Sequence, residues 1–328
     1  MKSSTTKTVA IVVLGWNNQD LLADCFKSIQ DQTYPNVKII YVDNNSSDQS
    51  IEFVKKNFPE VEVLAQPENR GFAEGNNIGI RAALGDGKVQ YVGLLNTDAR
   101  LAADWTRKIV EFANLKPKGA FYQGTTLDYN NPQIIDSTHI YVSRNGQGTQ
   151  GNWRHYFAKE IGPRKIFGTN AAACLISRTY IEAQPFSDFF DRTMFMYLED
   201  VDAAARSVAM GWDNYLVPGA RAYHIGSVSS GRNPGYSLYM TFRNNSGLLV
   251  KNFPFRILLR MWPKLVRGDL DTIRTLWRRG NKRAIWKVVK GRFVGLLRIP
   301  LFLPKRFKLA KYRQIDKSYL WDLMRRGY

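Results

Sequence analysis

Residues 8–48 read TVAIVVLGWNNQDLLADCFKSIQDQTYPNVKIIYVDNNSSD and contain the pattern that decides the fold. Two runs of apolar, largely β-branched residues, 9–14 and 37–42, are typical of strands that are covered on both faces. Between them, apolar residues from Leu21 to Ile29 recur at the spacing of one helix face. A strand, a helix and a second strand follow one another, as in an α/β protein.

The alternation of strand and helix continues along the chain. Further strands are predicted at 61–64, 89–95 and 119–123, and helices at 51–58, 72–84 and 104–115. This order predicts a mostly parallel sheet with helices on both faces. Residues 124–165 are polar and predict a hairpin or irregular insert around the Arg144-Asn145-Gly146 turn. Beyond the insert, the sequence predicts a strand at 171–176, a helix at 199–210 closed by Gly211, and a short strand at 214–217.

Charge divides the chain into two parts. The 328 residues are 44% hydrophobic, which excludes a disordered chain, a collagen-like repeat and a disulfide scaffold. The formal net charge is +19, and residues 251–328 contain 22 basic and 4 acidic side chains. We therefore expect a nearly neutral body, 1–250, joined to a strongly basic tail, 251–328. The tail consists mostly of helix formers from Phe255 onward, with breaks expected at Pro263, Pro300 and Pro304.

The cysteines and the amino-terminal sequence indicate where the chain resides. Cys25 and Cys174 each lie in an apolar segment and are expected to be reduced core thiols. The apolar run 9–14 is too short for a signal peptide and has no small-residue cleavage site after it. No stretch reaches the ~18–20 apolar residues that a membrane span needs. We expect a cytoplasmic chain.

Polar loops rich in Asn and Asp follow four of the predicted strands. They are Gly15–Asn18, Asp43–Asp48, Asn69–Asn77 and Asn96–Asp98. Such residues often serve only in turns and caps. In open α/β sheets, however, ligands bind beyond the carboxyl ends of the strands, and four such loops at one edge predict a binding site.

Two of these loops indicate a nucleotide and a metal ion. Asn69–Asn77 carries Arg70 and two glycines before a helix, which favours a diphosphate. It lacks the GxGxxG and Walker spacings, so a different mode of nucleotide binding is predicted. Asp98 follows a buried strand and is well placed to hold a divalent cation against phosphate. The alternative is a strand-end Asp that caps the next turn.

A second acidic cluster lies at 197–206, where carboxylates fall in a first helical turn and are stabilised by the helix dipole. Asp202 and Arg206 are four residues apart, which predicts an ion pair. Glu199 shares a face with Asp202, whereas Asp200 points away from it. Asp200 is therefore free for another task, such as that of a general base.

The three histidines have no strong signal of their own. His139 and His155 lie in the insert, and we expect them to be packed or surface residues. His224 follows an apolar segment, and a role for it comes from the family resemblance.

Together these segments resemble the inverting GT-A glycosyltransferases of family 2, especially the bacterial rhamnosyltransferase-like branch. The resemblance covers roughly residues 8–250. Besides the opening stretch, the matching pieces are PENRGFAEGNNIGI, LLNTDA, FGTNAAACLIS, MYLEDVDAAARSVAMGW, AYHIGSVSS and FRNN. The family's Asp-X-Asp loop reads Asn96-Thr97-Asp98 here, which leaves Asp98 as its one carboxylate for the metal.

The resemblance implies roles for individual residues. Asp98 and His224 would coordinate Mg²⁺ or Mn²⁺ on the diphosphate, and Asp200 would deprotonate the acceptor hydroxyl. The half at 8–123 would bind the donor and the half at 124–250 the acceptor. The residues assigned to the nucleotide sugar are Gly15, Trp16, Asn17, Asp43, Asn45, Asn69, Arg70, Gly71, Asn77, Asn96, Thr97, Asp98 and Arg243.

The chemistry agrees with these assignments. Inverting transfer needs one base and charge neutralisation on the leaving diphosphate. Glycosidases instead need a carboxylate pair, and nucleotidyltransferases need a Gly-rich basic loop where this chain has GWNNQD. The expected reaction moves a sugar, L-rhamnose from dTDP-rhamnose or a sugar from UDP, to a saccharide or lipid-linked oligosaccharide in cell-surface polysaccharide assembly.

The tail has two interpretations. Its Trp and Leu residues alternate with Lys and Arg, which suits an anionic membrane surface at 255–328 and a peripheral position on the inner face of the cell membrane. Alternatively it is a helical cap on the body with a solvated basic face. It carries no nucleic-acid motif, and we expect no nucleic-acid partner for the enzyme. The competing hypothesis is a catalytically silent protein that docks membrane or nucleic acid through this tail.

Overall fold

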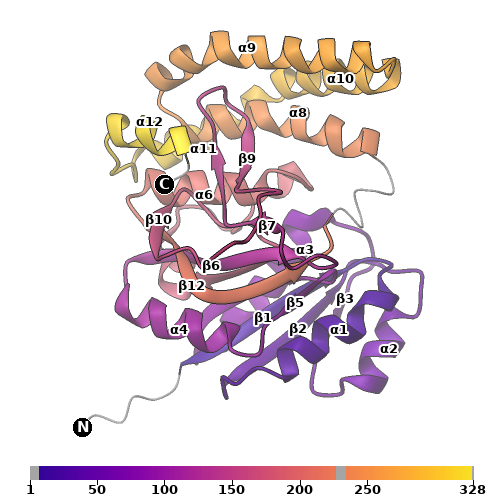
Figure 1. The fold of residues 1–328 in the computed structure, drawn as a ribbon. Helices are drawn as coiled ribbons and strands as arrows, with labels where there is room; N and C mark the ends of the chain where they lie inside the picture. Colours follow the sequence, from indigo (N-terminus) through magenta and orange to yellow (C-terminus); the bar gives the residue numbers. More distant parts are fainter. Residues whose placement is uncertain (1–6, 227–233, 327–328) are drawn as a thin grey trace.

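The computed structural model describes residues 7–226 and 234–326 (Figure 1). Residues 227–230, which end the AYHIGSVSS segment, lie outside the described residues. The strands are β1 Thr8–Gly15, β2 Val37–Asp43, β3 Glu62–Ala65, β4 Val89–Asn96, β5 Ala99–Leu101, β6 Gly119–Asp128, β7 Ile135–Ser137, β8 His139–Val142, β9 Gly148–Gly151, β10 Arg164–Ile166, β11 Ala173–Ser177 and β12 Asp213–His224.

The helices follow the expected alternation in the first half of the chain. They are α1 Gln19–Gln30, α2 Ser50–Asn57, α3 Gly71–Gly85, α4 Trp105–Leu115, α5 Arg178–Ala183, α6 Glu199–Ala209, α8 Pro234–Asn252, α9 Phe255–Arg278, α10 Lys282–Leu297, α11 Ile299–Ala310 and α12 Lys317–Arg326, with a 3₁₀ turn at Arg192–Met194.

The central sheet is mostly parallel, as the sequence predicts. Its order is β10-β12-β6-β11-β4-β1-β2-β3, and β5 and β7 pair at its side. Strands β1 to β4 run parallel to one another, and β6 runs parallel to β12. Strand β11 lies between β4 and β6 and is antiparallel to both. The arrangement is the mixed α/β architecture with a mostly parallel sheet that the sequence predicts.

Alternate residues of β1 enter two hydrophobic cores, one on each face of the sheet. Val9, Ile11 and Val13 pack with residues of α1, α2 and α4. Ala10 and Val12 pack with residues of α3, α5 and α6. The continuous apolar run therefore reflects burial on both faces. Cys25 and Cys174 are free, buried thiols in these cores, as expected.

The insert forms the expected hairpin. β8 and β9 pair antiparallel around residues 143–147, and Gly146 has a φ of +79°. His139 is buried and His155 is exposed, in line with the expectation of packed or surface residues. The predicted strand at 214–217 is longer than expected, because β12 continues past Pro218 and Gly219 through a register shift between Leu216 and Arg221.

The carboxyl-terminal helices pack on the body rather than extending from it. A third core joins the hairpin, α6 and α8 to α9, α11 and α12, through residues such as Val142, Val201, Met261 and Leu323. Figure 1 shows α9 and α10 as the outermost layer, above α8. The charge boundary at residue 250 falls inside α8, a helix that the sequence analysis did not predict.

The expected helix breaks at Pro263 and Pro304 are wrong, because each residue lies inside a helix, whereas Pro300 stands at the start of α11. Pro263 lies inside α9, and its helix ends at Arg278, shortly before Gly280 with a φ of +66°. Pro263 lies on the exposed surface, where water can satisfy the carbonyl that its ring leaves without a donor. Within the described residues, no helix has both the length and the apolar character of a membrane span.

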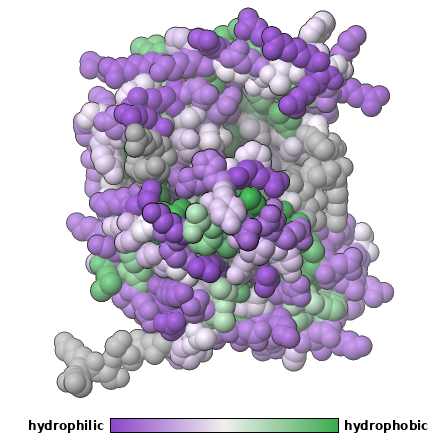
Figure 2. Space-filling model, viewed as in Figure 1, coloured by the Kyte–Doolittle hydropathy of each residue, from purple (hydrophilic) through white to green (hydrophobic). Residues whose placement is uncertain are grey.

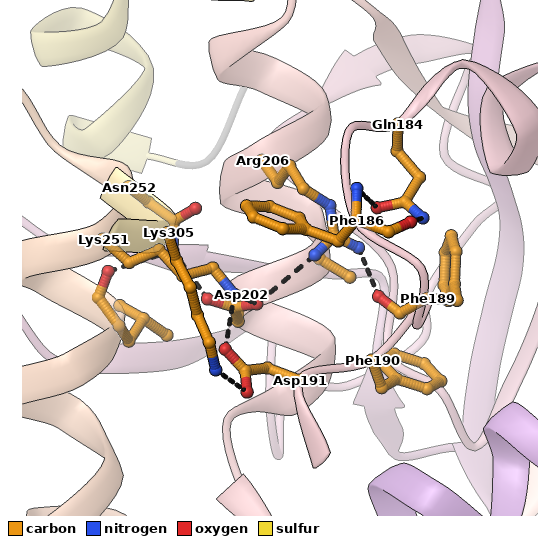
Figure 3. Close-up of polar contacts among 12 residues, drawn as sticks. Gln184, Phe186, Phe189, Phe190, Asp191, Asp202, Arg206, Lys251, Asn252 and Lys305 are labelled. Carbon is orange, nitrogen blue, oxygen red and sulfur yellow. Dashed lines mark hydrogen bonds and ion pairs between the residues drawn. The ribbon is translucent and has the colours of Figure 1, made fainter. Parts of the chain in front are cut away.

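A buried network of charges ties α8 and α11 to α6 (Figure 3). Lys251 Nζ donates to Asp202 Oδ2 at 2.6 Å and to Asp191 Oδ2 at 2.9 Å. Lys305 of α11 donates to the other oxygen of Asp191 at 2.6 Å. Asp202 also pairs with Arg206 at 3.6 Å, which confirms the predicted ion pair. The basic segment therefore supplies cations that neutralise carboxylates of the body.

Candidate active site

The polar loops after β1, β2 and β4 meet at one edge of the sheet. The backbone N–H of Asn44 donates to the carbonyl of Gly15 at 2.9 Å. The amide side chain of Asn18 lies 2.8 Å from Thr97 Oγ1. Because parallel strands end together, residues that are 79 positions apart in the sequence become neighbours there. The sequence prediction of a shared edge is correct.

Asp43 is a buried carboxylate at the end of β2. Its Oδ1 accepts from the Tyr41 hydroxyl at 3.1 Å, and its Oδ2 accepts from the Ser46 N–H at 2.9 Å. Beside it, Asn17 and Asn45 have φ angles of 53° and 66°. Trp16 is 39% exposed. A fixed carboxylate next to an accessible aromatic ring offers a hydrogen-bond acceptor and a stacking surface.

The loop before α3 is fastened to β2 by Asn44, a residue that the sequence analysis did not single out. Asn44 Nδ2 donates to Asn69 Oδ1 at 3.0 Å and to the Gly71 carbonyl at 3.3 Å, while its Oδ1 accepts from the Arg70 N–H at 2.9 Å. Asn44 is buried. A run of Asn and Asp in the sequence does not distinguish this buried amide from its exposed neighbour Asn45.

Gly71 and Asn77 face the segment that precedes α6. Gly71 has a φ of +77°, and a Cβ there would lie 2.5 Å from the Phe195 carbonyl oxygen, so only glycine fits. Asn77 directs its amide at the backbone of Phe190, with distances of 2.7 and 2.9 Å. Arg70 is partly exposed and pairs with Glu68 at 3.3 Å.

Asp98 and His224 come together, as the resemblance implies. His224 Nε2 lies 3.3 Å from Asp98 Oδ1, and His224 Nδ1 lies 3.0 Å from Asp136 Oδ2. Burial alone lowers the pKa of His224, but the two carboxylates outweigh it and raise that pKa to about 10. Asp136, in β7, was missed by sequence reasoning, because nothing in the insert marks it as the residue opposite His224.

This trio suits a divalent cation that is shared with a ligand. Metal sites commonly combine a carboxylate ligand with an imidazole ligand whose ring is oriented by a second carboxylate. Among the described residues no group of three or more His, Cys, Asp or Glu side chains stands ready to hold a metal by itself. Asp98 and His224 therefore fit a cation whose remaining ligands come from a diphosphate and water.

Asp200 lies in the first turn of α6 and is half-buried. It accepts from the Val201 N–H at 2.7 Å, and the Ala171 N–H also hydrogen-bonds to it. Burial raises the pKa of Asp200 to about 6, even though these N–H groups act in the opposite direction. A carboxylate with such a pKa is mostly ionised at neutral pH and can still accept a proton.

Glu199 has a different environment from its neighbour. Its side chain is buried, and its Oε2 has no hydrogen-bond partner in the part of the chain that the structure describes. Burial raises the pKa of Glu199 well above its usual value, and the negative charge of Asp200 adds to that effect. Burial therefore favours the neutral form more strongly at Glu199 than at Asp200.

Asp200 and Asp98 belong to the same edge of the sheet. The Ala172 carbonyl accepts from the Asn96 N–H at 2.9 Å, next to the Ala171 N–H that binds Asp200. Asn96 ends β4, two residues before Asp98. Residues 171 and 172 therefore link the end of β4, just before Asp98, to Asp200.

Arg243 hydrogen-bonds the segment that precedes α6 and its own neighbour in α8. Its Nη2 donates to the Met194 carbonyl at 2.6 Å, and its Nε donates to Asn244 Oδ1 at 3.0 Å. Burial and the nearby Arg298 lower the pKa of Arg243. The guanidinium therefore braces the backbone before α6.

Known proteins similar to this chain include several glycosyltransferases. The family model described as glycosyl transferase family 2 matches residues 10–183. An uncharacterized glycosyltransferase of Haemophilus influenzae is 30% identical over 107 residues, which cover 32% of this chain and 41% of that protein. The N-acetylglucosaminyl-diphospho-decaprenol L-rhamnosyltransferase of Mycobacterium tuberculosis is 24% identical over 313 residues, covering 88% of this chain and 99% of that protein.

Solved structures share the fold at low identity. A mannosyltransferase from Pyrobaculum calidifontis in complex with GDP-Man and Mn²⁺ is similar with a TM-score of 0.54 and 14% identity, over 94% of this chain and 86% of that one. GalNAc-T7 with UDP, GalNAc and Mn²⁺ has a TM-score of 0.59 and 14% identity, over 76% of this chain and 48% of that one. With a family model that matches more than half of its length, the chain belongs to glycosyl transferase family 2.

Proposed function

We propose that the protein is an inverting glycosyltransferase that moves a sugar from a nucleoside diphosphate to a saccharide hydroxyl. The observation that carries the proposal is the pair of acidic centres at one sheet edge. Asp98, with His224 and Asp136, stands at the end of β4, and Asp200 is tied to the same edge through Ala171. One centre suits the leaving diphosphate and the other suits the incoming hydroxyl.

The donor would occupy the loops after β1, β2 and β3. Asp43 would accept hydrogen bonds from the base or ribose, and the half-exposed Trp16 ring offers a stacking face. Asn44 holds residues 69–71 at the start of α3, where the positive end of the helix dipole favours a diphosphate. Gly15, Asn17, Asn45, Asn96 and Thr97 would line the same edge.

A divalent cation, when bound, would neutralise charge on the departing diphosphate. Asp98 and His224 would hold it, and Asp136 would orient the imidazole. Because an imidazole is a better ligand for Mn²⁺ than for the oxygen-demanding Mg²⁺, we favour Mn²⁺.

Asp200 would act as the general base in a single displacement. The acceptor oxygen forms a bond to the anomeric carbon, and the bond from that carbon to the diphosphate oxygen breaks. The proton of the acceptor hydroxyl passes to Asp200, and the electron pair leaves with the nucleoside diphosphate. Attack from the face opposite the leaving group inverts the anomeric centre.

We propose L-rhamnose as the sugar and a lipid-linked saccharide as the acceptor, in cell-surface polysaccharide assembly. The similarity to the mycobacterial rhamnosyltransferase along nearly the whole chain supports this choice. The tail supports a membrane-borne acceptor, because α9 and α10 expose a stripe of large apolar side chains among basic ones. The stripe consists of Phe255, Leu259, Trp262, Val266, Leu270, Trp277, Trp286, Val289, Phe293 and Leu297.

The stripe is a surface of the folded protein, since a different face of α9, with Ile257, Met261 and Leu265, packs on the body. On the side seen in Figure 2, hydrophilic residues predominate over this layer, with hydrophobic ones at its upper edge. Aromatic side chains beside Lys and Arg are suited to the boundary of an anionic bilayer. We therefore propose that this layer rests on the inner leaflet.

Turnover of nucleotide sugars tests the reaction. With Mn²⁺ present, dTDP-rhamnose, UDP-sugars and GDP-sugars are compared by release of the nucleoside diphosphate. Asp200→Asn should reduce kcat by about 10²–10⁴-fold with donor binding retained. Asp98→Ala should weaken both donor binding and turnover. Asp86→Asn, at a surface ion pair with Lys38, serves as the matched control and should leave turnover unchanged.

A wild-type protein that turns over none of these donors would refute the enzyme hypothesis and favour a silent binding protein.

Vesicle sedimentation tests the membrane surface. The wild-type protein should sediment with phosphatidylglycerol vesicles and much less with phosphatidylcholine. Trp262→Ser should weaken the binding, whereas Trp153→Ser, at an equally exposed tryptophan (55% for both) outside the tail, should not. Equal binding by both variants would exclude this surface.

A further inference from the structure

The backbone immediately before Asp200 is held in an unfavourable conformation. Phe195, Tyr197 and Leu198 have φ angles of 63°, 70° and 69°, and none of them is glycine. Large side chains rarely adopt this left-handed region, and such residues persist only where their surroundings hold them. The turn 194–198 leads directly into Glu199 and Asp200, so its shape determines where the carboxylate of Asp200 lies.

One buried amide holds this turn. Asn244 Nδ2 lies 2.9 Å from the Met194 carbonyl oxygen, 2.9 Å from that of Met196 and 2.8 Å from that of Tyr197. Its Oδ1 accepts from Arg243 Nε at 3.0 Å, which fixes the amide plane. Asn244 is only 1% exposed. Three carbonyls that point to one place need a donor there, because buried carbonyls without partners are costly.

The same turn also touches the donor loop. The Phe195 carbonyl accepts from the Ala73 N–H at 3.0 Å, in the first turn of α3. The ring and carbonyl of Phe195 also occupy the space that a side chain at Gly71 would fill. The turn therefore lies between the loop proposed for the diphosphate and the residue proposed as the base.

We propose that Asn244 is a positioning residue that fixes the left-handed turn 194–198 and thereby sets the placement of Asp200 relative to the bound donor. The inference rests on the proposed function and extends it to a residue of α8. Asn244 acts through the turn and touches neither substrate. Arg243 contributes by bonding Met194 and Asn244.

The next residue of α8 provides a matched control. Asn245 is also buried, at 4% exposed, and its Nδ2 donates to one carbonyl, that of Gly146 in the β8–β9 hairpin, at 2.6 Å. Its Oδ1 accepts from Arg292 at 2.9 Å. Both amides thus accept a bond from an arginine and donate to backbone carbonyls. They differ in which loop they hold.

The test compares Asn244→Ala with Asn245→Ala in the full-length protein by kinetics and amide hydrogen exchange. Asn244→Ala should reduce kcat by about 10²-fold with a much smaller change in donor KM, because misplacement of a reacting group affects the chemical step most. In Asn244→Ala, amide hydrogen exchange should be faster than in the wild type in the peptides that contain Ala73 and Met196. Asn245→Ala should keep kcat and accelerate exchange around Gly146. Asn244→Asp, which keeps the volume and loses the donors, should resemble Asn244→Ala.

The pH profile provides a readout that a general loss of stability would not move. If water reaches Asp200 when the turn loosens, the acid limb of kcat/KM should shift to lower pH in Asn244→Ala and stay in place in Asn245→Ala. Should Asn244→Ala not fold, Asn244→Ser, which retains one hydroxyl donor, is measured in the same way.

Equal kinetics and equal exchange patterns in the two alanine variants would overturn the proposal. So would protection of Ala73 and Met196 that is unchanged in Asn244→Ala. A wild-type protein without turnover would instead refute the proposed function, and the exchange data would still decide whether Asn244 holds the turn.

Discussion

At the scale of single residues, Glu199 and Asp200 show how neighbouring carboxyl groups acquire different environments. Glu199 is enclosed, and its Oε2 has no partner among the described residues, so burial raises its pKa and favours its neutral form. Asp200 receives hydrogen bonds from the Val201 and Ala171 N–H groups, which stabilise its anion. The ionised carboxylate is the one whose hydrogen-bond partners lie at the sheet edge.

The pH dependence of the reaction follows from Asp200. Since the base must be ionised and its pKa is raised to about 6, kcat/KM should be constant above about pH 7. Below pH 6 it should fall about tenfold per pH unit as Asp200 becomes protonated. Initial rates at saturating metal in a series of buffers would measure this limb. A flat profile down to pH 4 would contradict the role of Asp200.

Substitution of Glu199 by its neutral analogue, glutamine, provides a complementary prediction. Because burial and the charge of Asp200 favour the neutral form of Glu199, Glu199→Gln should retain most of the wild-type kcat, whereas Asp200→Asn should not. Both variants are measured at pH 7.5 with the same donor. A loss in Glu199→Gln as large as in Asp200→Asn would mean that Glu199 is the ionised group.

At the scale of elements, α6 is held in place by cations from α8 and α11. Lys251 is 1% exposed and bridges Asp191 and Asp202, and Lys305 reaches Asp191 from the other side. Burial by itself raises the pKa of Asp191. The charges of Lys251 and Lys305 outweigh this effect and hold that pKa well below its usual range. The helix that presents Asp200 is therefore fastened by charges from the basic end of the chain.

Removal of Lys251 should be strongly destabilising. Lys251→Met leaves two buried carboxylates without their shared cation, which typically costs about 3–5 kcal/mol. Lys38→Met, at the exposed pair with Asp86, should leave the free energy of unfolding nearly unchanged. Urea unfolding at pH 7.5 measures both. Similar losses in the two variants would show that the buried network contributes little.

The same network gives stability a pH dependence. Asp191 has a depressed pKa when folded, so its contribution is present above its unfolded pKa of about 3.9 and declines as the pH falls below that value. The free energy of unfolding should therefore decrease below about pH 4. In Lys251→Met this decrease should be smaller, because one of the two cations that lower the pKa of Asp191 is absent.

At the scale of the whole molecule, the basic segment is part of the folded body as well as a candidate membrane surface. The third core contains Ile257, Leu265, Phe302 and Leu323 together with Val142 and Phe167. Both interpretations of the tail therefore have a physical basis. One face packs on the body, and the opposite face exposes aromatic and basic side chains.

Truncation separates these two roles. Deletion of residues 255–328 should expose the third core and the Asp191 carboxylate, so the remaining chain should unfold at much lower urea concentration or aggregate. Substitutions on the exposed stripe, such as Trp262→Ser, should leave the unfolding midpoint unchanged. A truncated protein that unfolds like the full-length chain would show that the tail is an independent module.

Much of the candidate site could be predicted from sequence. The loops after β1, β2 and β4 follow continuous apolar runs, and the parallel topology places them together. Asp98 and His224 were paired through the family resemblance, and the structure brings them within 3.3 Å. Asp136, Asn44 and Asn244 could not be found in this way, because each acts through a contact with a segment that is distant along the chain.

The sequence by itself determined the α/β order, the mostly parallel sheet and the edge at which the polar loops gather, because these depend on local periodicity and on strand polarity. Only the tertiary structure decided that Pro263 continues a helix and that the basic segment neutralises Asp191 and Asp202. It also decided which asparagine holds the turn before Asp200. These features depend on the free energy of burying particular groups beside distant partners, which no local pattern records.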